Sequence, residues 1–167
     1  MTGRRTGRAL LAGGLLLALL APGCGVRPSE VIRGRPAVSG PAVGTGLYLL
    51  ARGELVLVLR PAKVVPSPAD TLALLAAGPE EHERGQGFTS DVPAALDPVT
   101  VTSGAGPAGG LTVRTTTAVR TLSADAADQI ICTVTDAAAQ VGSAQNSAPV
   151  TIVGSDGARP PRPCPIR

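Results

Sequence analysis

The N-terminal quarter of this chain decides how much of it is left to fold. Arg4, Arg5 and Arg8 precede an almost wholly apolar run from Ala9 to Leu20, which is the pattern of a secretory leader. The run is shorter than the roughly 20 apolar residues that a membrane-spanning helix needs. We therefore predict a cleaved signal peptide over residues 1–23.

A cysteine follows directly after the predicted leader, and small residues precede it. The residues from Leu20 to Cys24 resemble the bacterial lipobox, in which a small residue precedes the cysteine that receives lipid. We predict that Cys24 is lipidated and holds the chain at the extracytoplasmic face of the cell membrane. Because Ala21-Pro22 fits the motif less well than Gly23-Cys24, cleavage without lipidation remains the alternative.

The leader also accounts for the basic charge and the odd cysteine. It holds three of the 15 Lys and Arg residues, and the others balance the 12 Asp and Glu residues. Without net positive charge there is little long-range attraction to phosphates, so nucleic acid is excluded as a partner. Cys132 and Cys164 remain, and in an oxidising compartment we predict a disulfide between them, with two unpaired thiols as the alternative.

The mature chain begins with a linker and a hairpin. Residues 24–45 are rich in Gly, Pro and Arg and are expected to form a flexible linker. Two apolar runs, Leu47–Leu50 and Leu55–Leu59, then flank a turn predicted at Arg52-Gly53. Because the second run is almost continuously apolar, we expect a strand in the middle of the domain that is covered on both faces, or packed on one face and shielded by a neighbour on the other.

Two helices have clear start signals. Ser67 and Pro68 suit the cap and first position of a helix that should run to Ala77 and stop at Gly78, with a short turn from Pro79 to Arg84 after it. Ser123 should cap the longer helix. Its apolar residues recur at helical spacing, at Ala127, Ile131, Val134, Ala138 and Val141.

The remaining segments are predicted to be short strands or extended, because they carry β-branched residues between turn residues. They are Phe88–Ser90, Val99–Thr102, Leu111–Thr115, Ala118–Leu122 and Val150–Val153. We predict an α+β fold over residues 46–153, with a small mixed sheet and two main helices, followed by a Pro- and Arg-rich tail over residues 154–167.

Two patterns could carry chemistry, and neither has the context it needs. Gly104–Gly109 matches a dinucleotide-binding fingerprint but leads into a predicted strand instead of a helix, so we interpret it as a hairpin loop. His82 is the only histidine, and its neighbours at one-residue spacing do not converge on a helix surface, which favours a solvated turn. We predict no catalytic residue, no metal site and no cofactor.

Several segments together resemble a known family. These are the hairpin Leu47–Arg60, the helix end Leu74–Pro79 with Glu83, and Leu122-Ser123 before the helix containing Gln129–Ile131. In this order they are similar to the GerMN domain of sporulation and germination proteins, which also occurs in actinobacterial lipoproteins. The resemblance covers roughly residues 46–153, although Thr121-Leu122 stands where members often have an acidic residue. It implies a compact α/β module of envelope assemblies without catalytic residues or cofactor.

These expectations define a function hypothesis and two alternatives. The hypothesis is a lipid-anchored, non-catalytic module that binds an envelope protein or cell-wall partner. The first alternative is an envelope hydrolase that uses His82 with Ser90 or Asp91. The second is a small solute-binding lipoprotein, although the chain is short for two lobes.

Overall fold

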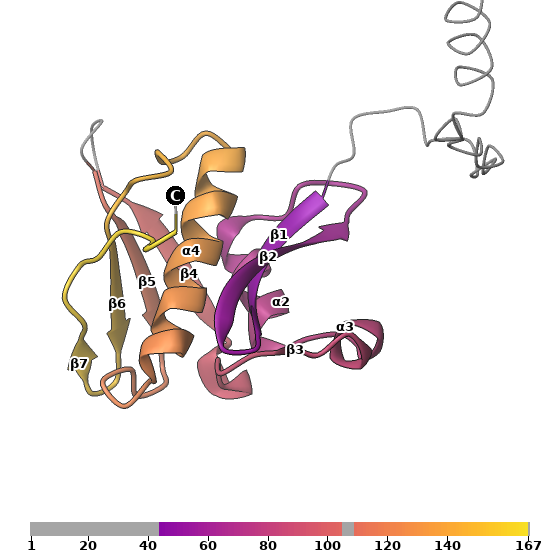
Figure 1. The fold of residues 1–167 in the computed structure, drawn as a ribbon. Helices are drawn as coiled ribbons and strands as arrows, with labels where there is room; N and C mark the ends of the chain where they lie inside the picture. The colour runs from indigo at the N-terminus through magenta and orange to yellow at the C-terminus, as the bar shows by residue number, and fades with distance from the viewer. Residues whose placement is uncertain (1–43, 105–108, 167) are drawn as a thin grey trace, which may run out of the picture. The chain divides into compact units, whose positions relative to one another are not determined.

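A computed structural model describes residues 44–104 and 109–166 of the chain. It confirms the predicted α+β class, with two main helices and two sheets. The predicted signal peptide, Cys24 and all but the last two residues of the predicted linker lie outside the described residues. The elements, labelled in Figure 1, are β1 (Gly44–Ala51), β2 (Glu54–Pro61), α2 (Pro68–Ala76), α3 (Glu81–Gly85), β3 (Phe88–Thr89), a short 3₁₀ turn (Ala94–Leu96), β4 (Val99–Ser103), β5 (Leu111–Thr115), α4 (Ala124–Gln140), β6 (Val150–Gly154) and β7 (Gly157–Ala158).

The strands form two sheets where the sequence suggested one. The first has the order β2-β1-β3 and is antiparallel. The second has the order β4-β5-β6-β7 and is mixed, because β5 and β6 run parallel. Parallel neighbours need a long crossover, and α4 is part of that connection. Figure 1 shows α4 lying between the two sheets.

The first hairpin confirms the predicted turn and corrects the predicted place of its second strand. Arg52 and Gly53 have φ angles of 54° and 80°, as expected for a two-residue turn whose twist matches the strands. β2 is not in the middle: it is an edge strand, and Leu57 and Leu59 are 43 % and 67 % exposed. β1 holds the centre of the sheet and begins at Gly44, within the predicted linker.

The capping signals placed the first two helices correctly to within a residue or two. The Oγ of Ser67 accepts the N–H of Asp70 at 3.1 Å, and α2 ends at Ala76. Gly78 follows with a φ of 80°, a conformation that favours glycine at the end of a helix. The predicted second turn is α3. Glu83 caps the start of this helix by accepting the N–H of Glu80 at 2.7 Å.

The longest helix also follows its prediction. Ser123 caps α4 by accepting the N–H of Ala126 at 3.0 Å. Four of the five stripe residues are buried, whereas Val141 lies past the end of the helix and is 46 % exposed. Gln129 and Thr133 are buried on the same helix although they are polar.

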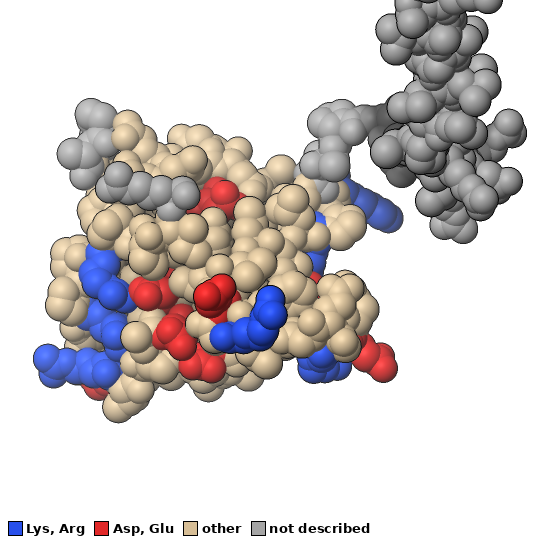
Figure 2. All heavy atoms as spheres, viewed as in Figure 1, with Lys and Arg blue, Asp and Glu red and all other residues tan. Residues whose placement is uncertain are grey.

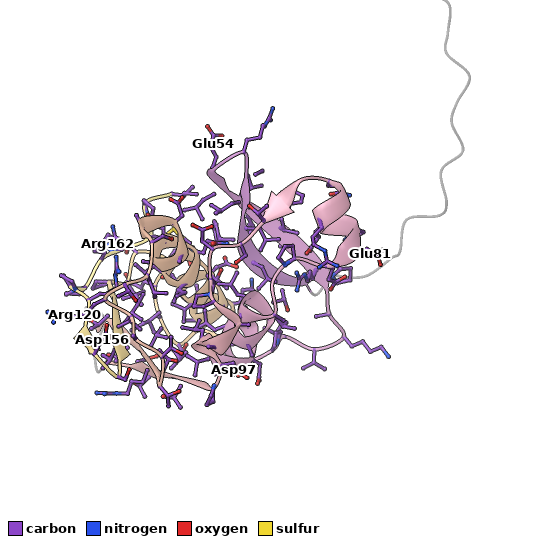
Figure 3. The ribbon with its side chains drawn as sticks, turned by 90° about the horizontal axis from the view of Figure 1, so that it is seen from below. Glu54, Glu81, Asp97, Arg120, Asp156 and Arg162 are labelled. Carbon is purple, nitrogen blue, oxygen red and sulfur yellow. A yellow bond between two sulfur atoms is a disulfide. The ribbon has the colours of Figure 1, made fainter. Side chains whose placement is uncertain are left out.

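The segment Ala118–Leu122 forms no strand and turns at Arg120-Thr121, which corrects its prediction as a short strand. The carboxylate of Asp156 accepts the backbone N–H groups of Val119 and Arg120 at 2.8 and 3.0 Å. These bonds, that from Val119 first, hold the pKa of Asp156 below its usual value. Figure 3 shows Arg120 and Asp156 close together at one end of the molecule.

Both sheets and both main helices contribute to one hydrophobic core. Its fully buried side chains include Leu47, Leu49, Leu72, Leu75, Leu111, Ile130 and Ile152. Burial of a side chain of this size stabilises the fold by roughly 1.5–3 kcal/mol. The core therefore fixes α4 against β1 and places one end of the helix beside the candidate site.

Candidate binding groove

A groove of about 950 Å³ lies beside the second half of α4. Its walls are β1, α4, the loop over residues 144–147 and the C-terminal segment over residues 163–166. Ligand pockets in proteins commonly measure roughly 300–1,000 Å³. The groove is therefore large enough for a few residues of peptide or a small solute.

The predicted disulfide forms part of one wall. Cys132 of α4 is bonded to Cys164 of the tail, with the two Cα atoms 4.8 Å apart. Cys132 is buried, and Cys164 packs against the core. Both cysteines line the groove, so the bond brings the tail into it.

The tail is held at a second point. The backbone N–H and C=O of Arg162 bond to Val150 of β6 at 3.1 and 2.8 Å. The Nη2 of Arg162 also lies 2.5 Å from the carboxylate of Asp128 on α4. The Pro- and Arg-rich tail is thus packed on the second sheet, and the rim of the groove is supported on both sides of Pro163.

Tyr48 lines the groove from β1, and α4 fixes its backbone. The N–H of Tyr48 donates to Thr133 Oγ1 at 3.0 Å, and its C=O accepts from Gln129 Nε2 at 2.9 Å. The side chain is half-buried. Burial raises the pKa of the Tyr48 phenol above its usual value of 10.0, and the negative charge of Asp136 raises it further.

Asp136 is the acidic residue of the groove and lies against β1. Its Oδ2 accepts from Gln140 Nε2 at 2.8 Å. A Cβ atom at Gly46 would be 2.6 Å from this oxygen, so the missing side chain at Gly46 makes room for the carboxylate. Among the described residues, no Lys, Arg or His forms an ion pair with Asp136.

The other walls carry neutral polar and apolar groups. Gln145, Asn146 and Ser147 provide amide and hydroxyl groups, while Ala139, Ala144 and Ile166 are apolar. No basic residue lines the groove in the part of the chain that is described. Figure 2 shows the molecular face that contains α4, with acidic side chains over the helix and basic ones both toward β6 and β7 and beside the helix on the side of β1 and β2. The groove therefore offers hydrogen bonds and one unbalanced negative charge.

The histidine singled out from the sequence is on a different part of the molecule. His82 lies in α3 with its side chain 65 % exposed, and its Nδ1 is 3.4 Å from a carboxylate oxygen of Glu80. The residues suggested as its partners have other contacts. Ser90 Oγ is 3.3 Å from Gln129 Nε2, and Asp91 Oδ2 accepts from Ser123 Oγ at 3.0 Å.

The glycine-rich segment follows its hairpin interpretation. It joins β4 to β5, which are antiparallel, and the N–H of Gly104 donates to the C=O of Gly110 at 2.8 Å. Residues 105–108, inside the segment, are outside the described part of the chain. The helix that a pyrophosphate-binding loop requires is replaced by a strand.

Residues 44–104 and 109–166 contain neither a metal-binding cluster nor a membrane-spanning helix. No group of three or more His, Cys, Asp and Glu side chains there could hold a metal ion. No helix there is long and apolar enough to cross a membrane. Cys24, the predicted lipidation site, belongs to neither range.

No known protein family, no curated protein and no solved structure matches this chain. The similarity to the GerMN domain therefore stays a prediction.

The sequence predicted the two cysteines of the groove but not its polar residues. The spacing of one polar residue could have indicated it. Asp136 follows Cys132 by four residues in α4, which places a carboxylate on the same helix face as the disulfide. Tyr48 gave no such signal, because only the pairing of β1 with α4 brings it to Asp136.

Proposed function

We propose that this protein is a lipid-anchored, non-catalytic binding module on the extracytoplasmic face of the cell membrane, and that its groove binds a short cationic peptide segment of an envelope partner. The observation that carries the proposal is the carboxylate of Asp136, which lines the same groove as Tyr48, with no basic residue among the described lining. A ligand ammonium or guanidinium group would supply the missing charge.

The chemistry of the lining favours a peptide over a glycan. The face of an aromatic ring attracts a cation, so Tyr48 and Asp136 would act on the same group. The amides of Gln145 and Asn146 can donate to and accept from a peptide backbone. Glycan sites use aromatic rings as stacking surfaces, whereas Tyr48 is the one aromatic residue in this lining.

The hydrolase alternative receives no support from the contacts of His82. A general base must come within hydrogen-bond distance of its nucleophile or of a water molecule next to it. His82 instead contacts Glu80 at the start of its own short helix, whereas Ser90 and Asp91 contact side chains of α4 and its N-cap. For this reason the binding module is the function that we propose.

The groove can be tested with capped tripeptides that carry Lys, Gln or Glu at the centre. Titration of the full chain followed by NMR should shift the resonances of Tyr48, Asp136 and Asn146 with the Lys peptide most strongly. Asp136→Asn should weaken that binding about fivefold, because a partly exposed ion pair contributes up to roughly 1 kcal/mol. Asp125→Asn is the matched control, since it removes the same charge from the same helix outside the groove.

Two outcomes would contradict this proposal. One is equal affinity for the Lys and Glu peptides. The other is a Lys affinity that Asp136→Asn leaves unchanged while the variant keeps its fold by circular dichroism.

The anchor is tested separately. Cys24→Ala should abolish incorporation of labelled fatty acid and move the protein from the membrane fraction to the medium, or leave the precursor uncut. Fatty-acid labelling of the variant at the wild-type level would show that Cys24 is not the lipidation site.

A further inference from the structure

The outer edge of β2 is the largest unexplained feature of the described fold. β2 lies at the end of the first sheet, and no described strand pairs with that edge. Its register with β1 runs without interruption from Glu54 to Pro61, so no bulge bends it away. Protein edge strands usually avoid association through charges, prolines, bulges or a covering element. From Leu55 to Leu59, β2 has five consecutive aliphatic residues.

The contacts of β1 show which peptide groups of β2 point to this free edge. The N–H and C=O of Tyr48 bond to α4, so they point away from β2. Leu57 lies directly opposite Tyr48. In an antiparallel pair, the N–H and C=O groups of two opposite residues either point toward the partner strand in both residues or point away from it in both. The peptide groups of Leu57 therefore point outward, and those of Leu55 and Leu59 do so two residues to either side.

The strand is complementary to itself in charge and in shape. Counted from Leu57, the residues on the two sides are aliphatic, and the ends are Glu54 and Arg60. Two antiparallel copies centred on Leu57 would place Glu54 opposite Arg60 of the second copy and Leu55 opposite Leu59. Figure 3 shows Glu54 at the tip of the hairpin, directed away from the body of the protein. Arg60 is buried, donates to Glu83 through Nε and Nη2 and to the C=O of Gly78 through Nη2, and its Nε lies 3.6 Å from Glu80. Only its Nη1 is left for Glu54 of the second copy.

We propose that two copies of this chain associate through β2, edge to edge and antiparallel, with the two-fold axis at Leu57. Each hydrogen-bonded pair exchanges two bonds, so the pairs Leu57–Leu57 and the two Leu55–Leu59 pairs supply about six backbone bonds. Leu57 and Leu59 of both copies, now 43 % and 67 % exposed, would lie side by side on one face. Pro61 ends the pairing, because it has no N–H to donate. The two three-stranded sheets become one.

The assembly is tested on the full chain in detergent by sedimentation and light scattering. The wild-type chain should be a dimer at micromolar concentration. Leu59→Lys puts a charge at an exposed position of the interface and should make the chain monomeric or weaken the dimer at least tenfold. Val64→Lys is the control, because Val64 is 77 % exposed and lies outside β2. Circular dichroism shows whether each variant keeps its fold.

The register is tested with single cysteines and a short bis-maleimide linker, with the wild-type chain as background. Leu57→Cys should crosslink to its own copy. Glu54→Cys should not, because two Glu54 residues would lie about six residues apart along the pair, or roughly 20 Å. Glu54→Lys should weaken the dimer about threefold, since an opposite-charge pair across strands contributes roughly 0.2–1 kcal/mol.

Three results would overturn this inference. They are a wild-type monomer at 100-fold higher concentration, a dimer that Leu59→Lys leaves intact, and equal crosslinking at positions 54 and 57. A monomer whose Leu57→Cys thiol is protected from maleimide would instead assign the edge to another segment of the chain. Peptide binding in the groove is measured separately, although Leu57 and Asp136 both lie over Gly46.

Discussion

β1 and β2 are the two strands of one hairpin and have similar aliphatic content, yet they lie in opposite environments. In β1 the side chains of Leu47, Leu49 and Leu50 are nearly inaccessible, whereas in β2 Leu57 and Leu59 are exposed. Leu47 and Leu49 point to the core face of the sheet, whereas Leu57 and Leu59 point to the opposite face. The outer edges of the two strands differ as well. β1 is bordered by α4 and β3, and β2 has no described neighbour there. Hydrophobic content alone therefore does not decide which strand becomes the centre of a sheet.

The border between β1 and α4 is polar, which is unusual for a buried junction. Gln129 is fully buried and uses its side chain to join Tyr48 of β1 to Asp91 of the loop after β3. Thr133 satisfies the N–H of Tyr48 one helical turn later. A buried backbone group without a partner costs about 1–3 kcal/mol, so these two side chains allow a strand to be covered by a helix.

The largest effect on stability is expected when the same Leu→Ala truncation is made in each of the two strands. Leu47→Ala should lower the free energy of unfolding by about 2–5 kcal/mol, because it leaves a cavity in the core. Leu59→Ala should change it by less than about 0.5 kcal/mol, because the side chain is largely in water. Urea denaturation below the concentration of self-association measures both. Similar losses in the two variants would mean that β2 is buried in solution.

A smaller effect is expected at the polar border. Gln129→Leu should destabilise the protein by about 1–3 kcal/mol, because the C=O of Tyr48 and the N–H of Asp91 lose their partner. Gln140→Leu is the matched control in the same helix, where the side chain is exposed and little change is expected. If Gln129→Leu left the free energy of unfolding unchanged, water or another group would have to donate a hydrogen bond to the C=O of Tyr48 in β1.

The smallest effect concerns Arg60, the one buried residue of β2, and its ion pair with Glu83 of α3. Hydrogen bonds from Arg60, opposed by burial, hold the pKa of Glu83 below its usual value of 4.5. Because the folded-state pKa is the lower one, the contribution of this pair is complete above about pH 4.5 and declines as the pH falls through the folded value. Unfolding free energies measured from pH 7 to pH 2 should be flat at first and then fall. Glu83→Gln should lose this step, and Glu81→Gln should keep it.

Local signals predicted a large part of the fold. Ser67 and Ser123 start helices because a hydroxyl can satisfy a free N–H at a helix start, and Gly53 allows the tight turn because it accepts a positive φ. The pairing of Cys132 with Cys164 followed from counting cysteines. Each of these inferences depends on residues near one another in sequence or on a small set of alternatives.

The errors have a common physical cause. Ala118–Leu122 has strand-like composition, but Asp156, which lies far along the chain, binds its N–H groups and turns it. β2 has the sequence of a central strand, but β1 has the neighbours. The groove combines Tyr48 with Asp136, which are 88 residues apart in the printed sequence. Periodicity and composition contain no information about such pairs.

The sequence by itself determined the α+β class, the helix starts, the first turn and the cysteine pair, because local hydrogen bonding and covalent chemistry act over short distances or few choices. Tertiary structure decided which strand is central, which edge is free and which groove Tyr48 and Asp136 share. Those features depend on how α4 crosses from β5 to β6 and which of its side chains then reach β1. That choice is made by the packing of the whole core.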